Sequence, residues 1–270
     1  MTLEAWLRSH PYLRSVAQLH AQVDAATAAI SPTECSALPW KDYADDFLKG
    51  VPLLHSSSIT IDYAPVEEIT RSLIDSLASR SSPTNLAEEV RSVKNELHRD
   101  PEVQRLIAGL LNNDPHSQSH SGLQRYLGWT VLARYLRPLI EKFSRWRDGE
   151  RWLRNYCPTC GSLPAMAQLV GVDQGRQRFL CCGCCRTRWL YLRTGCPFCG
   201  NADDHLLAAL TVEGEGGLRI DYCESCKGYL KTYAGEGNET VLLADWTSTH
   251  LDVLARDRGL KRLAASLYEL

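Results

Sequence analysis

The fold is decided by a cysteine-rich stretch that begins with Cys157-Pro-Thr-Cys160-Gly161 and returns as Cys196-Pro-Phe-Cys199-Gly200. Each copy is followed by a further Cys-x-x-Cys pair, so one unit of about 35–40 residues occurs twice, as in an internal duplication. Two residues between cysteines let both sulfurs bind one ion while the backbone turns around it. The glycine after each pair tolerates a positive φ. The pattern predicts two tandem ribbons, each closed by a four-thiolate metal site.

The two predicted sites differ in how far residue spacing specifies them. The second site is unambiguous, and its ligands are Cys196, Cys199, Cys223 and Cys226. The first site takes Cys157 and Cys160 together with two thiols of the run Cys181-Cys182-Gly183-Cys184-Cys185. Two pairs within that run have the required spacing: Cys181 with Cys184, and Cys182 with Cys185. Spacing alone leaves this choice open.

The distribution of cysteines favours metal over disulfides. Ten of the eleven cysteines lie between Cys157 and Cys226, and Cys35 lies apart. The N-terminus has Glu4 and no apolar h-region, and no apolar run approaches the roughly 18 residues of a membrane span. We therefore expect a cytoplasmic protein without membrane insertion, where disulfides are rare. A redox dithiol or disulfide scaffold is the competing interpretation.

The expected metal is zinc or iron, because a tetrahedral thiolate site accepts either. We expect two ions, one in each four-cysteine site. Closed all-sulfur sites are usually structural, since catalytic zinc keeps an open position. Structural zinc contributes on the order of 10–16 kcal/mol in peptides, enough to fold ribbons with little apolar core. We accordingly expect no catalytic residue and no enzymatic activity.

The segments on either side of the ribbons have helical periodicity. Helices are expected over residues 13–30, 66–77, 86–98 and 102–111, and from 123 to a kink or end at Pro138. Residues 31–64 are expected to be mostly loop. A helical tail should include Trp246 and His250, with Gly259 breaking it before residues 260–267.

Between these helices the segments are short, rich in β-branched or aromatic residues, and punctuated by glycine. Strands are expected over residues 166–172, 177–180, 189–192, 206–212, 218–222 and 229–233. The sequence thus predicts an α+β protein with an N-terminal all-helical domain, two tandem rubredoxin-like or zinc-ribbon modules and a short helical C-terminal tail. The expected boundaries are 1–150 for the helical domain, 151–195 and 196–235 for the ribbons, and 236–270 for the tail.

Arginines and aromatic residues alternate around the cysteine run. Between Gln174 and Gly195 there are five arginines and no acidic residue. On a ribbon they could bind a nucleic-acid backbone while the aromatic rings stack on bases. Alternatively the arginines face solvent, pair with acids elsewhere, or form a patch for a protein partner. The net charge of -2 weighs against nucleic acid. Thiols left over beside these arginines would have a lowered pKa if exposed; the alternative is that one is buried and the other is a bystander.

Four features within residues 156–232 resemble the family of formate dehydrogenase accessory proteins, FdhE. They are Cys157-Pro-Thr-Cys160-Gly161-Ser-Leu-Pro164, then Arg178-Phe-Leu before the cysteine run and Trp189, then Cys196-Pro-Phe-Cys199, and finally Cys223-Glu-Ser-Cys226-Lys-Gly-Tyr229-Leu230-Lys231. In that family the tryptophan follows the metal-binding cysteine by four positions. This register implies Cys182 and Cys185 as ligands and leaves Cys181 and Cys184 as extra thiols, a departure from the usual pattern.

The resemblance implies a cytoplasmic protein whose knuckles are similar to those of rubredoxin and bind iron or zinc. It also implies a role in assembling active formate dehydrogenase through contact with the immature catalytic subunit. We expect that role to be protein–protein binding. A rubredoxin-like iron redox protein and a nucleic-acid-binding zinc ribbon are the alternatives.

Overall fold

The chain divides into two compact units, each built from more than one segment. The computed structural model describes residues 1–28, 30–31, 40–79, 84–97, 101–112, 121–172 and 175–268, so Cys35 lies outside the described residues. The sheet unit comprises Met1–Ser9, Asp46–Pro52 and Asp148–Ser266. The helical unit comprises His10–Asp45, Leu53–Arg147 and Leu267–Leu270. The expected domain boundaries at residues 150, 195 and 235 stay predictions.

The helical unit is built around two helices that contact most of the others. Its helices are α2 (Arg14–Thr27), α4 (Ala64–Ala78), α5 (Thr84–Leu97), α6 (Glu102–Leu111), α7 (Gly122–Tyr135) and α8 (Arg137–Trp146). Helix α4 contacts α2, α5, α6 and α7. Helix α7 is buried on nearly every side, and Gly128 lets it approach α6, since a Cβ there would lie 2.6 Å from the Leu110 side chain. The break between α7 and α8 falls just before Pro138, as expected of a residue that cannot continue a helix.

One helix lies where a loop was expected. Within residues 31–64 the structure has α3 (Trp40–Lys49) and a 3-10 turn at Leu53–His55, so the expectation of a mostly loop segment is wrong for these residues. Tyr43 and Phe47 share one face of α3 at a spacing of four and are both buried. The Tyr43 ring lies 5.9 Å from that of Phe143. Serines and prolines in the flanking sequence hid this short apolar face.

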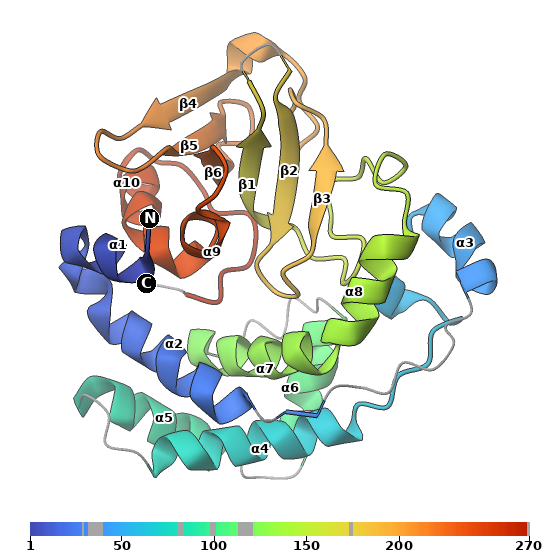
Figure 1. Ribbon diagram of the computed structural model, residues 1–270, viewed down its shortest axis with the longest axis vertical. Coiled ribbons are helices and arrows are strands. Elements are labelled where there is room, and N and C mark those ends of the chain that lie inside the picture. The colour runs from blue at the N-terminus through green and yellow to red at the C-terminus, as the bar shows by residue number, and fades with distance from the viewer. Residues whose placement is uncertain are drawn as a thin grey trace. The chain divides into compact units, whose positions relative to one another are not determined.

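The sheet unit contains a single six-stranded sheet (Figure 1). The strands are β1 (Pro164–Val170), β2 (Gln177–Cys182), β3 (Arg188–Tyr191), β4 (Leu207–Thr211), β5 (Leu218–Cys223) and β6 (Tyr229–Ala234). Their order is β3-β2-β1-β6-β5-β4. All neighbours are antiparallel except β1 and β6, which pair in parallel from Met166 opposite Lys231 to Leu169 opposite Ala234. The strands of both predicted ribbons are therefore hydrogen-bonded into one sheet.

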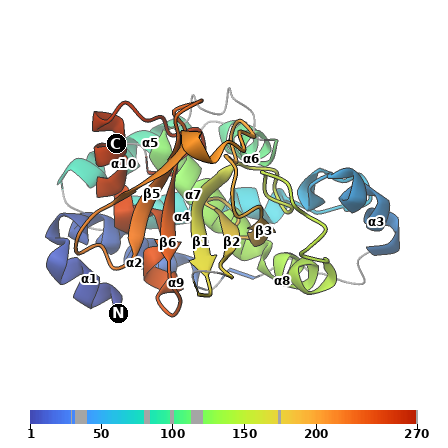
Figure 2. The same ribbon diagram turned by 90° about the horizontal axis from the view of Figure 1, so that it is seen from above.

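Helices from both ends of the chain belong to the sheet unit. They are α1 (Leu3–Ser9), α9 (Glu239–Leu242) and α10 (Thr249–Asp257), with a 3-10 turn at Asp245–Ser248. Figure 2 shows α9 and α10 beside β6 and β5. The buried Trp6 of α1 donates its indole N–H to the carbonyl of Thr247 at 3.0 Å.

After Gly259, which has a φ of 73°, the described residues 260–268 are not helical. Lys261 instead forms a parallel bridge with Gly228, and its carbonyl accepts a hydrogen bond from the Tyr229 N–H at 3.1 Å. The predicted α+β class is confirmed. In the described ranges, no helix is long and apolar enough to cross a membrane.

Candidate metal centres

The described cysteines near the ribbons form two groups of four. Cluster 1 is Cys157, Cys160, Cys182 and Cys185, and cluster 2 is Cys196, Cys199, Cys223 and Cys226. Within each cluster all four sulfurs lie within 4.8 Å of one another. In cluster 1 the Cys157–Cys185 and Cys160–Cys182 sulfurs are 3.4 and 3.5 Å apart. In cluster 2 the Cys196–Cys226 and Cys199–Cys223 sulfurs are 3.7 and 3.8 Å apart. Four sulfurs at about 2.3 Å from a tetrahedral ion are about 3.8 Å apart, so each cluster could hold a metal ion.

The same backbone turn carries every pair. The N–H of each first cysteine donates to the carbonyl five residues on: Cys157 to Ser162 at 2.9 Å, Cys182 to Thr187 at 2.9 Å, Cys196 to Asn201 at 2.8 Å and Cys223 to Gly228 at 3.0 Å. The residue after each pair has a positive φ: Gly161 76°, Arg186 63°, Gly200 74° and Lys227 59°. The turn at Cys182–Cys185 thus matches the other three, and the structure groups these two thiols with Cys157 and Cys160. This is the register that the family resemblance implies.

Cluster 1 is buried at every position. Burial raises the pKa of Cys160 and Cys182 well above the ordinary value. Burial also acts against ionisation of Cys185, but its hydrogen bonds with the neighbouring thiols and with Thr187 hold its pKa well below the ordinary value. The Thr187 hydroxyl lies 3.2 Å from the Cys185 sulfur. Buried thiolates need a compensating cation, because charge in a dry site is costly. The donor set of cluster 1 therefore fits a divalent metal ion.

Cluster 2 is closer to solvent. Cys199 is exposed and Cys226 half-buried, whereas Cys196 and Cys223 are buried. Burial raises the pKa of Cys196 to about 12, and a hydrogen bond from the Asn201 N–H lowers that of Cys199. Backbone N–H groups also point at sulfur, since Phe198 donates to Cys196 at 3.4 Å. The cluster has the same donor set as cluster 1 in a wetter environment.

The two extra thiols are not exposed nucleophiles. Cys184 is buried, and Cys181 is half-buried in β2. Burial raises the pKa of Cys181 to about 12, and the nearby Arg188 lowers it only in part. The arginines were expected to lower the pKa of a leftover thiol only if that thiol is exposed, and Cys181 does not meet this condition because it is desolvated. Sequence spacing could not reveal this, since it does not report burial.

Arg178 and Arg188, two of the five arginines, are held by contacts within the sheet unit. Arg178 is only 6% exposed, and one of its guanidinium N–H groups donates to the Gly195 carbonyl at 2.9 Å. Arg188 donates to the side-chain oxygen of Gln168 at 2.6 Å and stacks 4.4 Å from the centre of the Phe179 ring. These two guanidinium groups serve the packing of the unit.

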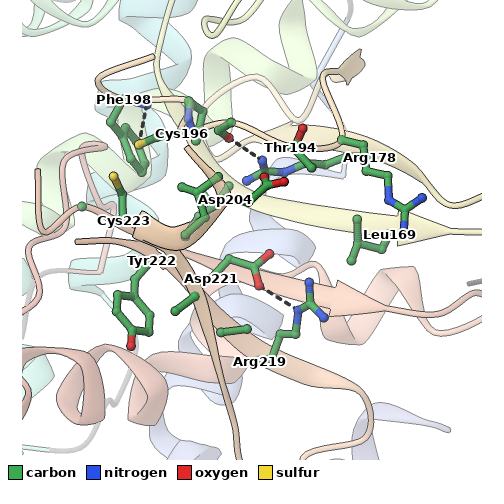
Figure 3. A pocket seen from close by; sticks show the side chains of 18 of the residues that line it. Leu169, Arg178, Thr194, Cys196, Phe198, Asp204, Arg219, Asp221, Tyr222 and Cys223 are labelled. Atoms are coloured by element: carbon green, nitrogen blue, oxygen red, sulfur yellow. Dashed lines mark hydrogen bonds and ion pairs between the residues drawn. The ribbon is translucent and has the colours of Figure 1, made fainter. Parts of the chain in front are cut away.

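A pocket of about 440 Å³ lies beside cluster 2 (Figure 3). Cys196 and Cys223 line it, together with Arg178 and the ion pair between Arg219 and Asp221 at 2.8 Å. Burial lowers the pKa of Arg178, while the charge of Asp221 raises it. Arg178 stands on strand β2 of the first ribbon, so residues of both ribbons meet at this wall of cluster 2.

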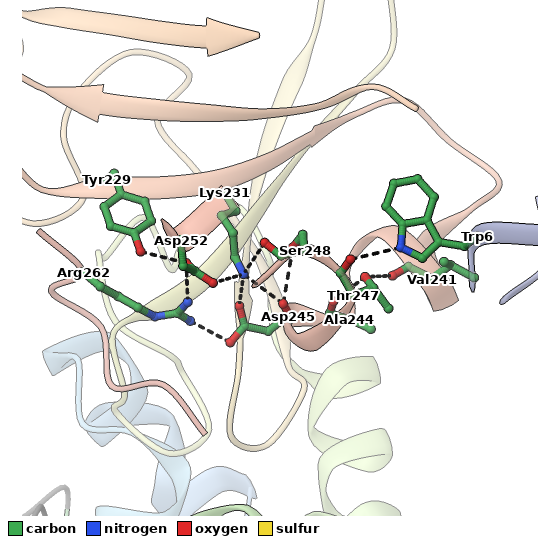
Figure 4. A network of polar contacts seen from close by, with 10 residues as sticks. All are labelled: Trp6, Tyr229, Lys231, Val241, Ala244, Asp245, Thr247, Ser248, Asp252 and Arg262. Carbon is green, nitrogen blue, oxygen red and sulfur yellow. Dashed lines mark hydrogen bonds and ion pairs between the residues drawn. The ribbon is translucent and has the colours of Figure 1, made fainter. Parts of the chain in front are cut away.

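A buried ion network occupies the other side of β6 (Figure 4). The Lys231 ammonium group is 2.7 Å from carboxylate oxygens of both Asp245 and Asp252. Arg262 contacts the same two carboxylates at 2.6 and 2.8 Å, and the Tyr229 hydroxyl donates to Asp252 at 2.7 Å. In the sequence, Tyr229 and Lys231 stand out only as part of a family motif. Their partners are distant in the sequence, and only the fold reveals them.

Fold and clusters together define a class: α+β proteins that combine a helical unit with a sheet bearing two four-cysteine knuckle sites. Within this class the family model for the FdhE central domain matches residues 156–193. The predicted resemblance to the FdhE family is confirmed by this match and by similar sequences and a similar structure.

The similar sequences extend well beyond the cysteine-rich stretch. A protein called "Protein FdhE homolog" from Aquifex aeolicus is 29% identical over 216 residues, which cover 78% of this chain and 72% of the relative. "Protein FdhE" from Salmonella arizonae is 28% identical over 211 residues, covering 76% of this chain and 66% of the relative. The chain thus spans about two thirds of the length of the Salmonella protein.

A solved structure has the same fold. It is the crystal structure of the FdhE protein from Pseudomonas aeruginosa, with a TM-score of 0.61 and 22% sequence identity. The match covers 95% of this chain and 88% of that one. At this identity the likeness speaks for the fold alone.

Proposed function

We propose that this chain is an accessory protein that helps to assemble active formate dehydrogenase in the cytoplasm. The observation that carries the proposal is the similarity to an FdhE homolog over 78% of the chain, far beyond the cysteine motifs. The proposed partner is the immature catalytic subunit of formate dehydrogenase. The protein would act by binding this subunit, without enzymatic activity and without a nucleic-acid partner.

The metal would serve as a scaffold in this function. Each cluster would hold one zinc or iron ion through four thiolates, with Cys157, Cys160, Cys182 and Cys185 in one site and Cys196, Cys199, Cys223 and Cys226 in the other. Such a closed site leaves no open position for a substrate or water. The ion would fix the turns at the ends of the strands, and the folded sheet unit would then present its surface to the partner. In this scheme Cys181 and Cys184 are not ligands.

The test is genetic and biochemical. In cells that lack the gene, formate dehydrogenase activity should be lost and restored by the wild-type chain. A Cys196→Ser/Cys199→Ser variant should fail to restore activity, whereas Cys181→Ser should succeed. Affinity capture with the wild-type chain should retain the catalytic subunit. Full formate dehydrogenase activity in the deletion strain, together with no capture of the catalytic subunit, would remove the proposal.

A rubredoxin-like redox function is the second candidate, and the exposure of Cys199 favours it for cluster 2. An iron ion with one thiolate at the surface could exchange electrons with a partner protein. The natively purified protein would then absorb visible light through sulfur-to-iron charge transfer and would be reduced reversibly. Colourless protein with two zinc ions would end this candidate.

A further inference from the structure

Two side chains of the first ribbon reach the turn that carries Cys196 in cluster 2. Arg178 donates to the Gly195 carbonyl at 2.9 Å, and the side-chain amide of Asn155 donates to the Pro197 carbonyl at 2.8 Å. Gly195 and Pro197 are the residues directly before and after Cys196. The first ribbon therefore holds the backbone on both sides of this cysteine.

Both donors stand next to cluster 1 in the chain. Asn155 lies two residues before Cys157, and Arg178 lies on β2, the strand that ends at Cys182. Their positions consequently depend on the turns that cluster 1 would fix. A metal ion in cluster 1 would order these donors before they meet the second turn.

The surroundings of Arg178 restrict the conformation of its side chain. The side chain is 6% exposed, and its guanidinium carbon lies 6.0 Å from the centre of the Tyr191 ring. Figure 3 shows Arg178 in the pocket wall with Thr194 and Cys196. A buried guanidinium group beside thiolates also offsets part of their negative charge. Few rotamers are open to such a side chain, so it can hold the Gly195 carbonyl in one place.

The two hydrogen bonds to the Cys196 turn should affect metal binding most at cluster 2, because this cluster is the more exposed of the two. Its Cys199 is exposed and Cys226 half-buried, so water and competing ligands could reach an ion bound there. The turn at Cys196 contributes two of its four sulfurs and directs the Phe198 N–H toward one of them at 3.4 Å. Residues that orient metal ligands typically change metal affinity about 10–100-fold when they are removed.

We propose that Arg178 and Asn155 are positioning residues for the metal site of cluster 2. The metal affinity of cluster 2 then depends on the folded first ribbon. This inference rests on the proposed binding of one metal ion in each cluster. It makes loading of the two sites cooperative, because a first ribbon ordered by its own ion presents both donors to the second turn. By linkage, an ion in cluster 2 stabilises the first ribbon in return.

The experiment follows the release of zinc from the full, two-zinc chain to a chromogenic chelator. The exposed cluster 2 should give the fast phase, and a Cys199→Ser variant, which lacks this phase, assigns it. Arg178→Gln and Asn155→Ala should each speed the fast phase about tenfold or more and leave the slow phase unchanged. The unchanged slow phase also reports that the variant is folded.

Arg176→Gln is the matched control. Arg176 lines the same pocket, and its side chain donates to the Gly171 carbonyl at 3.3 Å. Its fast phase should equal that of the wild type. A wild-type chain that fails to bind two zinc ions when it is loaded with zinc would contradict the metal scaffold, and the positioning role with it. Two zinc ions and an unchanged fast phase in both variants would contradict the positioning role alone.

Discussion

At the scale of single residues, the cysteine turns require a left-handed backbone after each pair. Glycine takes this position twice, and among the described residues Arg186 and Lys227 are the only non-glycine residues with a positive φ. A side chain in this conformation costs about 1–2 kcal/mol. Gly200 has a φ of 74° and open space around it, so a Cβ there would add backbone strain without a clash.

The left-handed backbone after each pair predicts different effects on stability for substitutions at Gly200 and at Arg186. Gly200→Ala should lower the free energy of unfolding of the zinc-loaded protein by about 1–2 kcal/mol. Arg186→Gly should leave it unchanged or raise it by up to about 1 kcal/mol, because relief of strain offsets the greater freedom of glycine in the unfolded chain. Denaturant titrations of both variants measure this. An equal decrease in the free energy of unfolding of both variants would contradict the role given to the backbone conformation.

The register of cluster 1 is a second question at this scale. Alternation along β2 places Cys182 on the same side as Leu180 and turns Cys181 to the opposite face. The indole N–H of the buried Trp189 donates to the Arg154 carbonyl at 2.9 Å, which ties β3 to the segment before Cys157. We predict that Cys182→Ser binds one zinc ion and that Cys181→Ser still binds two. Metal analysis of the purified variants measures the number of bound zinc ions. Loss of an ion from Cys181→Ser would make Cys181, and not Cys182, the ligand of cluster 1.

At the scale of elements, the ion network connects Lys231 of β6 to Asp245, Asp252 and Arg262 of the C-terminal segment. Lys231 is 1% exposed and contacts Asp245 and Asp252. Removing one partner of a buried ion pair typically costs about 3–5 kcal/mol, because the other charge stays buried without compensation. Lys231→Met should therefore destabilise the protein by about that amount in denaturant titrations. Lys261→Met, at an exposed lysine of the same segment, should change stability by less than about 1 kcal/mol.

The network also predicts a dependence on pH. Burial alone would raise the pKa of Asp245, but the charges of Lys231 and Arg262 lower it below its ordinary value of 3.8. The stabilisation from this carboxylate is thus complete above pH about 4 and is lost as the pH falls through the lower, folded-state pKa. The stability difference between wild type and Asp245→Asn should shrink on acidification below pH about 4. Any metal held by the thiolates would be lost from both proteins in acid, so the difference between them isolates the carboxylate; a constant difference would contradict the prediction.

Sequence patterns predicted elements well where the signal is local. The strand β5 (Leu218–Cys223) begins at the expected residue because glycines precede it and its apolar residues Leu218, Ile220 and Tyr222 alternate with Arg219 and Asp221. The parallel pairing of β1 with β6 had no such signal, since it joins Met166 to Lys231 across both clusters. The partners of Lys231 were invisible for the same reason. The cysteine turns could be predicted because each is closed within six residues.

At the scale of the whole molecule, the two units differ in what stabilises them. The helical unit has an apolar core in which residues such as Val66, Leu106 and Leu127 are fully buried. The sheet unit contains both clusters, and metal bound there would contribute to its folding. Its buried Trp152 and Trp189 report on its integrity.

Removal of metal should therefore affect the two units unequally. We predict that a strong chelator shifts tryptophan emission to the red, as Trp152 and Trp189 become exposed, while most of the helical circular dichroism at 222 nm remains. The reason is that the longer helices belong to the helical unit, which contains none of the eight cysteines of the two clusters. Heating the chelated protein should then melt the remaining helices in a separate transition, and adding back zinc before heating should restore the emission. If helicity and emission were instead lost together on chelation, the units would fold as one, and the stability of the helical unit would depend on the metal as well.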